Sequence, residues 1–335
     1  MIAYGRWLMA CLSVKAGHSH KPLAIVKNTK MKRIILLLVL FLAGMTAFAQ
    51  NMKTYQYAER DTLQLYLDFY TPEHVHDSTI CMVYVFGGGF IGGHRDGKWE
   101  KAYFKQLVDE GFMVAAIDYR LGLKGAKNLG IFNTEPLEKA VYMATEDAIS
   151  AIAYLLEHAK ELKVNKDYIV MIGSSAGAIT SLQTDYALCN GYLNSNILPE
   201  NFRLAGVVSY AGAIFSHEGK VQYRNREPAP TMMFHGMRDN LVSYKGISFM
   251  NVGFFGTDAL VKRFVKYQYP YFARRFEDYG HSIAVAGPLT VDDLLWFCHH
   301  YIYNKERIQV DGTYTNLGST TMPPYDYYTP GDLYK

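Results

Sequence analysis

The chain has 335 residues, half of them hydrophobic, which is enough to bury a large core as one α/β domain or two small ones. Its formal charge of +3 comes from the first 49 residues, which hold seven of the 34 basic side chains and no acidic ones. The other 27 basic and 31 acidic side chains give residues 50–335 a net charge of −4. A mildly acidic body gives no electrostatic reason to expect a nucleic acid or an anionic membrane as partner.

Residues 31–49 have the three parts of a secretory signal peptide. A basic start at 31–33 precedes an apolar run over 34–44, and Ala47-Phe48-Ala49 is a small-residue cleavage site. The apolar run is shorter than the roughly 20 residues that span a bilayer. We expect cleavage after this site, export to the periplasm or the medium, and no stable membrane anchor. Residues 1–30 are interpreted as a mis-assigned extension of the reading frame. The alternative is that residues 31–49 remain as an uncleaved membrane anchor. N-terminal sequencing that finds a secreted form starting at residue 1 would contradict cleavage.

Short apolar runs alternate with helical spacing along the rest of the chain. Strand-like runs occur at 63–70, 80–86, 112–117, 168–172, 204–210, 231–235 and 271–276, and helical segments at 134–160, 178–189 and 290–303, the last with Thr290 as N-cap. This alternation predicts a single α/β domain over 50–335, with a mostly parallel sheet of about eight strands and helices on both faces.

Four segments between these elements are long enough to shape a pocket: 87–110, 120–137, 213–229 and 244–268. The last of them is a candidate lid. The tail 306–335 is polar, with Tyr and Pro, and we expect it either to strap across the surface or to be disordered.

The segment Gly173-Ser174-Ser175-Ala176-Gly177 lies between a predicted strand and a predicted helix. G-x-S-x-G in this context is the pattern of a nucleophile elbow, in which the serine occupies a strained turn at the top of a sheet. Side chains on the two glycines would collide with the strand and the helix. The pattern predicts that Ser175 is an exposed nucleophile.

A nucleophilic serine needs a base to take its proton and an acid to orient the base. In elbow-type hydrolases the chain order is Ser, Asp or Glu, and then His, and Ser175, Asp239 and His281 satisfy it. Asp239 follows a predicted strand, and the alternative is a turn residue. His281 lies on the loop after the last predicted strand, and the alternative is an exposed loop histidine.

Three side chains compete with these candidates. Glu277 and Asp278 could replace the acid, but they lie too close in sequence to His281 to bridge to its ring easily. His235 precedes the acid, and we expect it to buttress the acid loop.

Gly87-Gly88-Gly89 follows the strand-like run that ends at Phe86. Glycines at this place let backbone N–H groups approach a substrate carbonyl. We assign the oxyanion hole to the N–H groups of Gly88, Gly89 and Ala176. The alternative is a flexible turn.

The remaining candidate ligands predict no metal site and no cofactor. Cys81, Cys189 and Cys298 have spacings that specify neither a disulfide nor a zinc site. His74 and His76 could share a strand face, but no third ligand stands near, and we interpret them as loop residues.

Together these motifs resemble the α/β-hydrolase superfamily and, within it, the carboxylesterases similar to hormone-sensitive lipase and to bacterial feruloyl-type esterases. The resemblance runs over residues 62–303 and includes Asp118-Tyr119-Arg120-Leu121. It implies ester hydrolysis through an acyl-serine intermediate, without metal or cofactor. One position departs from the family pattern: relatives usually carry His before the glycines, and this chain has Phe86. The backbone donors survive that change, but the side-chain contacts that position the loop do not.

Our first hypothesis is an exported serine carboxylesterase acting on a small-molecule or carbohydrate ester with a short acyl chain. A serine peptidase of the same fold is the second, and a hydrolase-like binding protein without turnover is the third. The sequence leaves the oligomeric state open.

Overall fold

A computed structural model describes residues 51–126 and 134–315. The predicted signal peptide, its cleavage site and the extension before it lie outside the described residues, and so does most of the predicted tail. The described residues all belong to one compact unit, residues 50–335. None of their helices is long and apolar enough to cross a membrane.

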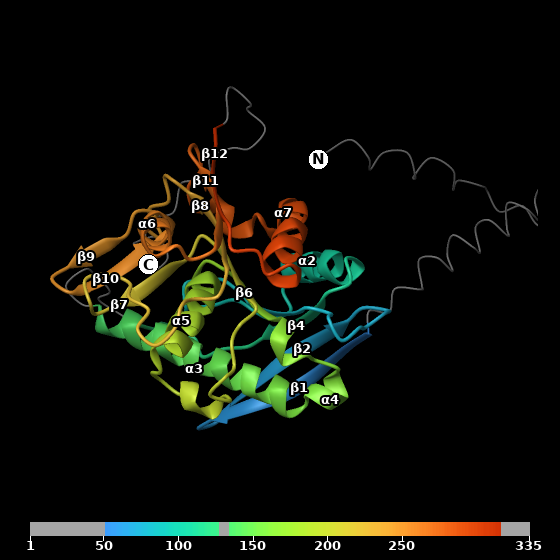
Figure 1. The fold of residues 1–335 in the computed structure, drawn as a ribbon. Coiled ribbons are helices and arrows are strands. Elements are labelled where there is room, and N and C mark those ends of the chain that lie inside the picture. Colours follow the sequence, from blue (N-terminus) through green and yellow to red (C-terminus); the bar gives the residue numbers. More distant parts are fainter. Residues whose placement is uncertain (1–50, 127–133, 316–335) are drawn as a thin grey trace, which may run out of the picture. The chain divides into compact units, whose positions relative to one another are not determined.

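Nine strands of the described chain form one mixed sheet (Figure 1). In spatial order they are β1 (Asn51–Arg60), β2 (Leu63–Thr71), β4 (Met113–Ile117), β3 (Cys81–Val85), β5 (Ile169–Ser174), β6 (Gly206–Tyr210), β8 (Thr231–Gly236), β11 (Tyr271–Phe276) and β12 (Gln309–Tyr314). β1 and β2 pair antiparallel, as do β2 and β4, and all other neighbours pair parallel. The prediction of a mostly parallel sheet is therefore confirmed.

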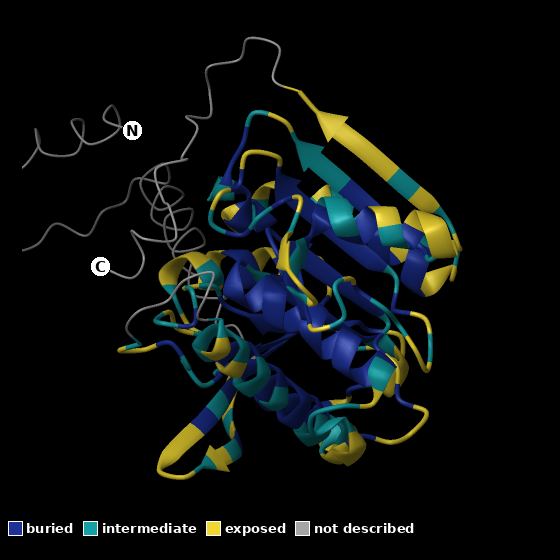
Figure 2. Ribbon diagram, turned by 90° about the vertical axis from the view of Figure 1, so that its left-hand side faces the viewer, coloured by how far each residue is buried: buried dark blue, intermediate teal, exposed yellow. Residues whose placement is uncertain are grey.

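The two outer strands carry no apolar run, which is why they are absent from the prediction. β1 reads Asn-Met-Lys-Thr-Tyr-Gln-Tyr-Ala-Glu-Arg, and the side chains of β12 are almost all exposed, as the yellow strand in Figure 2 shows. An edge strand is held by its backbone ladder and needs little apolar burial. The prediction that the tail forms a surface strap or is disordered is therefore wrong for residues 309–314, because they pair with β11 and extend the sheet.

Helices cover both faces of the sheet. Figure 1 shows α2 and α7 on one face and α3, α5 and α6 on the other. Their bounds are α2 (Lys98–Asp109), α3 (Glu135–Glu157), α4 (Ala159–Leu162), α5 (Ala176–Asn190), α6 (Thr257–Tyr267) and α7 (Val291–Phe297), with short 3-10 turns at Lys166–Tyr168, Ser195–Ile197, His281–Val285 and Gly287–Leu289. All of α5 but Asn190 is buried, and the dark helix across the middle of Figure 2 is this element.

The candidate lid segment 244–268 consists of two parts in the structure. Its first part is the hairpin of β9 (Ile247–Phe249) and β10 (Val252–Gly256), which forms a small antiparallel sheet with β7 (Ala213–Ser216). Its second part is α6, which buries Leu260, Val261 and Phe264. Because α6 packs against β8, β10 and β11, this half of the segment belongs to the core.

The last helix begins where predicted but is capped differently. Thr290 occupies the N-cap position of α7, yet its side chain makes no cap hydrogen bond. Its hydroxyl group lies 2.9 Å from the hydroxyl of Tyr210 and donates back to the carbonyl oxygens of Ala286 and Gly287. Beyond α7 the chain continues as a wider helical turn over Cys298–Tyr303.

Asp185 on α5 is a buried carboxyl group and predicts a pH-dependent stability. Burial raises its pKa to about 6, against the opposing hydrogen bond from the backbone N–H of Ala229 and the charge of Arg226. In the unfolded chain an Asp titrates near pH 3.9, so the folded state binds the proton more tightly. The carboxyl group therefore costs nothing below about pH 4, and its cost grows to about 3 kcal/mol as pH rises through 6.

Asp185→Asn should remove that cost, since an amide oxygen can still accept from Ala229. Urea unfolding should show the variant gaining about 2 to 3 kcal/mol over the wild type at pH 8 and little at pH 4. Asp61→Asn, at an exposed turn, is the matched control for the loss of one charge. If the difference in unfolding free energy between Asp185→Asn and the wild type were the same at pH 4 and pH 8, the prediction would be contradicted.

Candidate active site

The candidate residues follow strands that end at one edge of the sheet. In the register of the sheet, Val85 of β3 pairs with Gly173, and Ser174 of β5 pairs with Tyr210 of β6. Farther along, Tyr210 pairs with Phe234, and Gly236 at the end of β8 pairs with Phe276. The glycine loop, the elbow, the acid loop and the histidine loop thus leave the sheet at a common carboxyl edge, where open α/β sheets bind ligands.

Ser175 occupies the strained turn that the elbow pattern predicts, but it is buried, so the prediction of an exposed serine is wrong. Its backbone angles are φ 53° and ψ −118°, a region that costs a non-glycine residue on the order of 1–3 kcal/mol. Its backbone N–H donates to the carbonyl oxygen of Tyr210 at 2.8 Å, which ties the turn to the neighbouring strand. A Cβ on Gly173 would collide with the backbone of Gly177, so the strand and the helix meet only because both residues are glycine.

Gly177→Ala should destabilise the protein by at least about 3 kcal/mol, because the added methyl group would collide with the carbonyl oxygen of Val85 and lie 2.6 Å from that of Phe86. Both obstacles are backbone atoms and cannot rotate away. Gly92→Ala is the control: an added Cβ there meets nothing within 4 Å, and stability should be unchanged or rise by about 0.5 kcal/mol. Equal urea midpoints for Gly177→Ala and the wild type would contradict this steric argument.

Three side chains from separate loops meet at the elbow. The Nε2 atom of His281 lies 2.8 Å from the Oγ atom of Ser175, and its Nδ1 atom lies 2.7 Å from Oδ2 of Asp239. The Asp239 side chain is fully buried, whereas 16% of the His281 side chain remains exposed. These distances suit a hydroxyl that donates to an imidazole, which in turn donates to a carboxylate.

The carboxylate of Asp239 is held ionised. Burial opposes its charge, but hydrogen bonds from His235 and His281 outweigh burial and place its pKa well below the ordinary range. Its other oxygen, Oδ1, accepts from the backbone N–H groups of Leu241 and Val242, both at 2.9 Å. A carboxylate with every oxygen engaged has one orientation, and it points at the His281 ring.

His235 braces this loop from within the core. It is completely buried, and its Nε2 atom lies 2.9 Å from the carbonyl oxygen of Val242 and 3.2 Å from Oδ2 of Asp239. Because both neighbours only accept, Nε2 carries the hydrogen. Its Nδ1 atom lies 2.9 Å from the hydroxyl of Thr257 on α6. The core helix α6 therefore supports the acid loop through His235.

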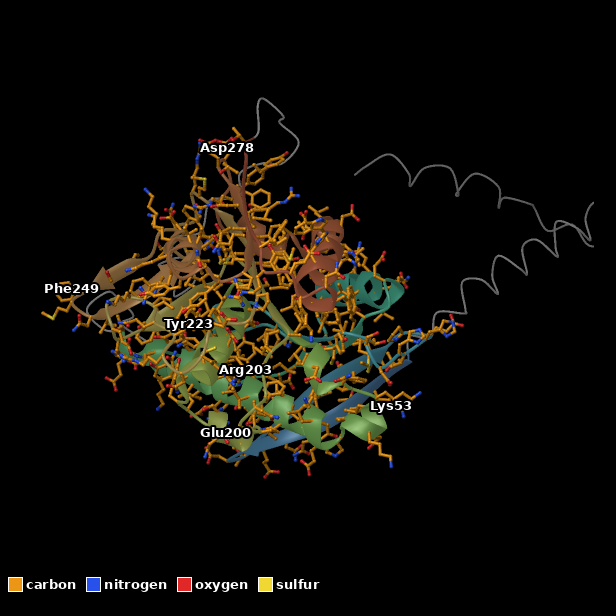
Figure 3. All side chains as sticks on the ribbon, viewed as in Figure 1. Lys53, Glu200, Arg203, Tyr223, Phe249 and Asp278 are labelled. Atoms are coloured by element: carbon orange, nitrogen blue, oxygen red, sulfur yellow. The ribbon has the colours of Figure 1, made fainter. Side chains whose placement is uncertain are left out.

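The competing acids lie elsewhere. Asp278, labelled in Figure 3 beyond the end of β11, accepts a hydrogen bond from Arg238 at 2.8 Å. Glu277 accepts from the hydroxyl of Thr315 at 2.8 Å. Neither contacts His281 among the hydrogen bonds of the described residues.

The glycine loop lies directly against the elbow. A Cβ on Gly87 would come within 3.3 Å of the Cβ atom of Ser175. Gly88 and Gly89 have φ values of 115° and 63°, which glycine adopts without strain. Ala176 is the first residue of α5, so its N–H group has no acceptor within the helix. Ser175 therefore lies between Gly87 of the glycine loop and the free N–H group at the start of α5.

Tyr119, which belongs to the segment 118–121 named for its resemblance, contacts this loop, and the sequence analysis did not predict that contact. It is the second residue after β4, whereas Phe86 is the first residue after β3, and the two strands are parallel neighbours. Its hydroxyl group donates to the carbonyl oxygen of Phe86 at 3.0 Å. The signal that could have found it is its place just beyond the end of a strand that neighbours β3, which requires knowing the strand order.

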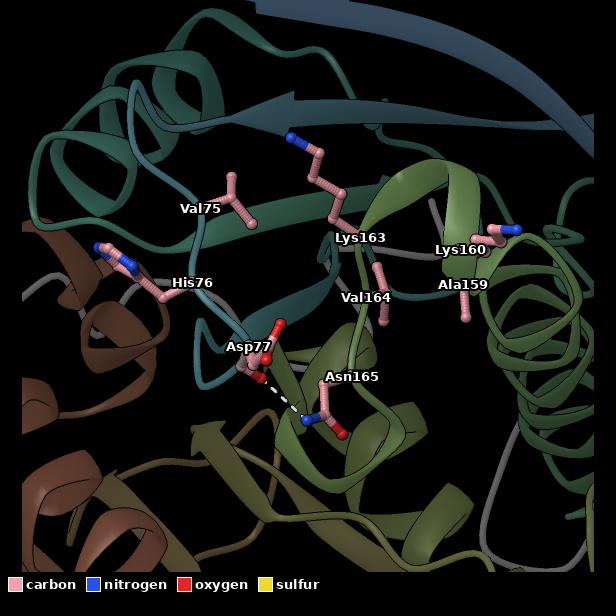
Figure 4. A pocket seen from close by; sticks show the side chains of 8 residues that line it. All are labelled: Val75, His76, Asp77, Ala159, Lys160, Lys163, Val164 and Asn165. Carbon is pink, nitrogen blue, oxygen red and sulfur yellow. Dashed lines mark hydrogen bonds between the residues drawn. The ribbon is translucent and has the colours of Figure 1, made fainter.

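A separate hollow of about 490 Å³ lies between residues 75–77 and 159–165 (Figure 4). Two of its lining residues are joined by a hydrogen bond from the Asn165 side chain to the carbonyl oxygen of Asp77. These segments precede β3 and β5, so the hollow lies at the amino ends of strands whose carboxyl ends carry the elbow. His76 lines it, as a loop residue.

No cluster of three or more potential metal ligands occurs in the described residues. Within that same part of the chain, Cys81, Cys189 and Cys298 are buried and unpaired. Burial raises the pKa of the Cys81 thiol to about 12, which makes it an inert core side chain.

The chain is similar to known esterases over part of its sequence. The BD-FAE family model matches residues 67–214, from β2 to β7. Mouse Carboxylesterase 5A is 33% identical over 121 residues, which cover 35% of this chain and 19% of the relative. Human Cocaine esterase is 30% identical over 118 residues, covering 34% and 19%. The chain thus matches about a fifth of the length of these relatives.

Solved structures extend the likeness to most of the fold. The native esterase Est2 of the planctomycete Thermogutta terrifontis has a TM-score of 0.55 at 19% identity, and the match covers 76% of this chain and 94% of that one. The same esterase phosphorylated by paraoxon has a TM-score of 0.53 at 19% identity, covering 75% and 95%. The sheet, the elbow and these likenesses together show that the chain has the α/β-hydrolase fold, with sequence similarity to carboxylesterases over about a third of its length.

Proposed function

We propose that the protein is an exported serine carboxylesterase that hydrolyses short-chain or carbohydrate-linked esters through an acyl-serine intermediate. The observation that supports this most is the pair of hydrogen bonds that joins Ser175 to His281 and His281 to Asp239. The signal-peptide pattern of residues 31–49 supports export.

In the first half of the reaction, the Oγ atom of Ser175 attacks the ester carbonyl carbon while its proton passes to Nε2 of His281. The carbonyl oxygen becomes an oxyanion, which the N–H groups of Gly88, Gly89 and Ala176 stabilise. His281 then returns the proton to the leaving alcohol as the ester C–O bond breaks. The acyl group remains on Ser175.

In the second half, a water molecule replaces the alcohol. His281 takes its proton, the resulting hydroxide attacks the acyl carbon, and a second oxyanion forms at the same N–H groups. Collapse of this intermediate breaks the bond to Ser175, and His281 returns the proton to the serine oxygen. Asp239 remains ionised throughout and stabilises the imidazolium that forms twice in each cycle.

The likenesses support esters as the substrate class. Relatives that match the chain are named carboxylesterase and cocaine esterase, and the Thermogutta terrifontis esterase has been solved with butyrate bound, at a TM-score of 0.55 and 20% identity. A four-carbon acyl group in that enzyme motivates short acyl chains for this one.

The test is a substrate screen with the purified protein. p-Nitrophenyl acetate and butyrate should be hydrolysed, and a fluorophosphonate probe should label a single peptide that contains Ser175. Acetylated xylan and feruloyl sugars should separate carbohydrate-linked esters from simple ones. Faster turnover of aminoacyl amides than of esters would favour a peptidase, and no labelling would favour a protein without turnover.

A further inference from the structure

Phe86, which stands where relatives usually carry histidine, lies against Tyr119. The two rings stack with centroids 4.4 Å apart and planes 29° apart, and both side chains are 3% exposed. A Cβ on Gly93 would come within 2.5 Å of the Phe86 ring, so the loop closes tightly over this pair. An aromatic stack thus takes the place of the side-chain contacts that the missing histidine would make.

The hydroxyl group of Tyr119 faces two successive carbonyl oxygens of the glycine loop. It donates to that of Phe86 at 3.0 Å and lies 3.5 Å from that of Gly87. Burial raises the pKa of Tyr119 far above its ordinary value, so the hydroxyl keeps its proton and remains a donor. Gly93 also packs close to the Gly87 oxygen, since a Cβ on Gly93 would lie 2.6 Å from it.

Anchored carbonyl groups determine where the neighbouring N–H groups point. In a trans peptide unit the C=O and N–H bonds point in opposite directions. Because the Gly87 oxygen faces Tyr119, the N–H of Gly88 points to the opposite side of the loop. The Gly88 oxygen in turn accepts from the N–H groups of Ile91 and Gly92 at 3.0 and 3.2 Å, which orients the N–H of Gly89 in the same way.

We propose that Tyr119 is a positioning residue for the oxyanion hole. It aligns the N–H group of Gly88 by holding the carbonyl oxygen of Gly87 and by anchoring the preceding carbonyl of Phe86. This inference rests on the proposed esterase function. It assigns to Tyr119 a part in transition-state stabilisation without contact to the substrate, since donors aimed before the reaction stabilise an oxyanion best.

The experiment compares Tyr119→Phe with Tyr70→Phe. The first keeps the ring stack and removes only the hydroxyl that holds the loop. The second removes a hydroxyl that is also buried but has no hydrogen-bond partner among the described residues. Kinetics with p-nitrophenyl butyrate, measured well below the melting temperature of each protein, separate kcat from KM.

For Tyr119→Phe, kcat should fall about tenfold, with KM within twofold of wild type. A misaligned donor still stabilises the oxyanion in part, so the loss should be smaller than that for removal of a donor. The rate of fluorophosphonate labelling should fall in parallel. Tyr70→Phe should change neither rate. A lower melting temperature with unchanged kcat would show a purely structural role and overturn the inference. Equal losses in both variants would also overturn it.

The proposed function can fail separately. A wild-type protein that neither hydrolyses esters nor reacts with the probe would overturn the function, and the inference with it. An active wild type with an equally active Tyr119→Phe variant would overturn the inference alone.

Discussion

Ser175→Ala should lower kcat for p-nitrophenyl butyrate by about 10⁶-fold and abolish fluorophosphonate labelling. Alanine keeps the Cβ atom and therefore the backbone strain at φ 53°, and it loses one hydrogen bond, to His281. The melting temperature should therefore stay within a few degrees of wild type. Both proteins must be purified free of host esterases, because traces of host esterase activity would mask so large a decrease in kcat.

Ser174→Ala is the matched control for that experiment. Ser174 is the neighbouring serine of the same motif, at the last position of β5, and makes no side-chain hydrogen bond among those of the described residues. Its replacement should leave kcat within about threefold of wild type. If Ser175→Ala retained more than a hundredth of the wild-type kcat, Ser175 would not be the nucleophile, and an equal loss in Ser174→Ala would point to damage of the elbow.

Asp239→Asn should lower kcat by about 10⁴-fold while the protein remains folded. The amide oxygen can keep the two backbone N–H bonds of the acid loop, which leaves the NH₂ group in the place of Oδ2. That group would face the N–H donors of His281 and His235. His281 then turns to the tautomer with hydrogen on Nε2, which cannot accept the proton of Ser175.

The control for this variant is Asp278→Asn, which removes a carboxylate of the neighbouring loop that pairs with Arg238 at the surface. It should leave kcat within about twofold of wild type. Stopped-assay and thermal-melt measurements on the same preparations distinguish lost catalysis from lost fold. Comparable losses in both variants would contradict the assignment of the acid to Asp239.

Much of this architecture was predictable because parallel strands buried on both faces need uninterrupted apolar runs. The runs at 112–117, 168–172 and 271–276 became β4, β5 and β11, with ends within two residues of those predicted. Glycines occur where two backbone segments pack too closely for a Cβ atom, so the elbow could be recognised from a short sequence pattern. Side chains such as Asp239 and His281 were found because they follow strand ends, and all parallel strands end at one edge.

Other features depended on contacts that no local pattern encodes. β1 and β12 lack apolar runs because backbone pairing at a sheet edge supplies their stability, and α6 became a core helix only through the strands it packs against. Which carboxylate meets His281 was decided by the register of β8 and β11. The hydrogen bond from Tyr119 to the carbonyl oxygen of Phe86 likewise requires β3 and β4 to be neighbours in the sheet. Local sequence patterns therefore identified the candidate catalytic side chains. The order and register of the strands, which bring together residues far apart in the chain, determined which of these side chains meet.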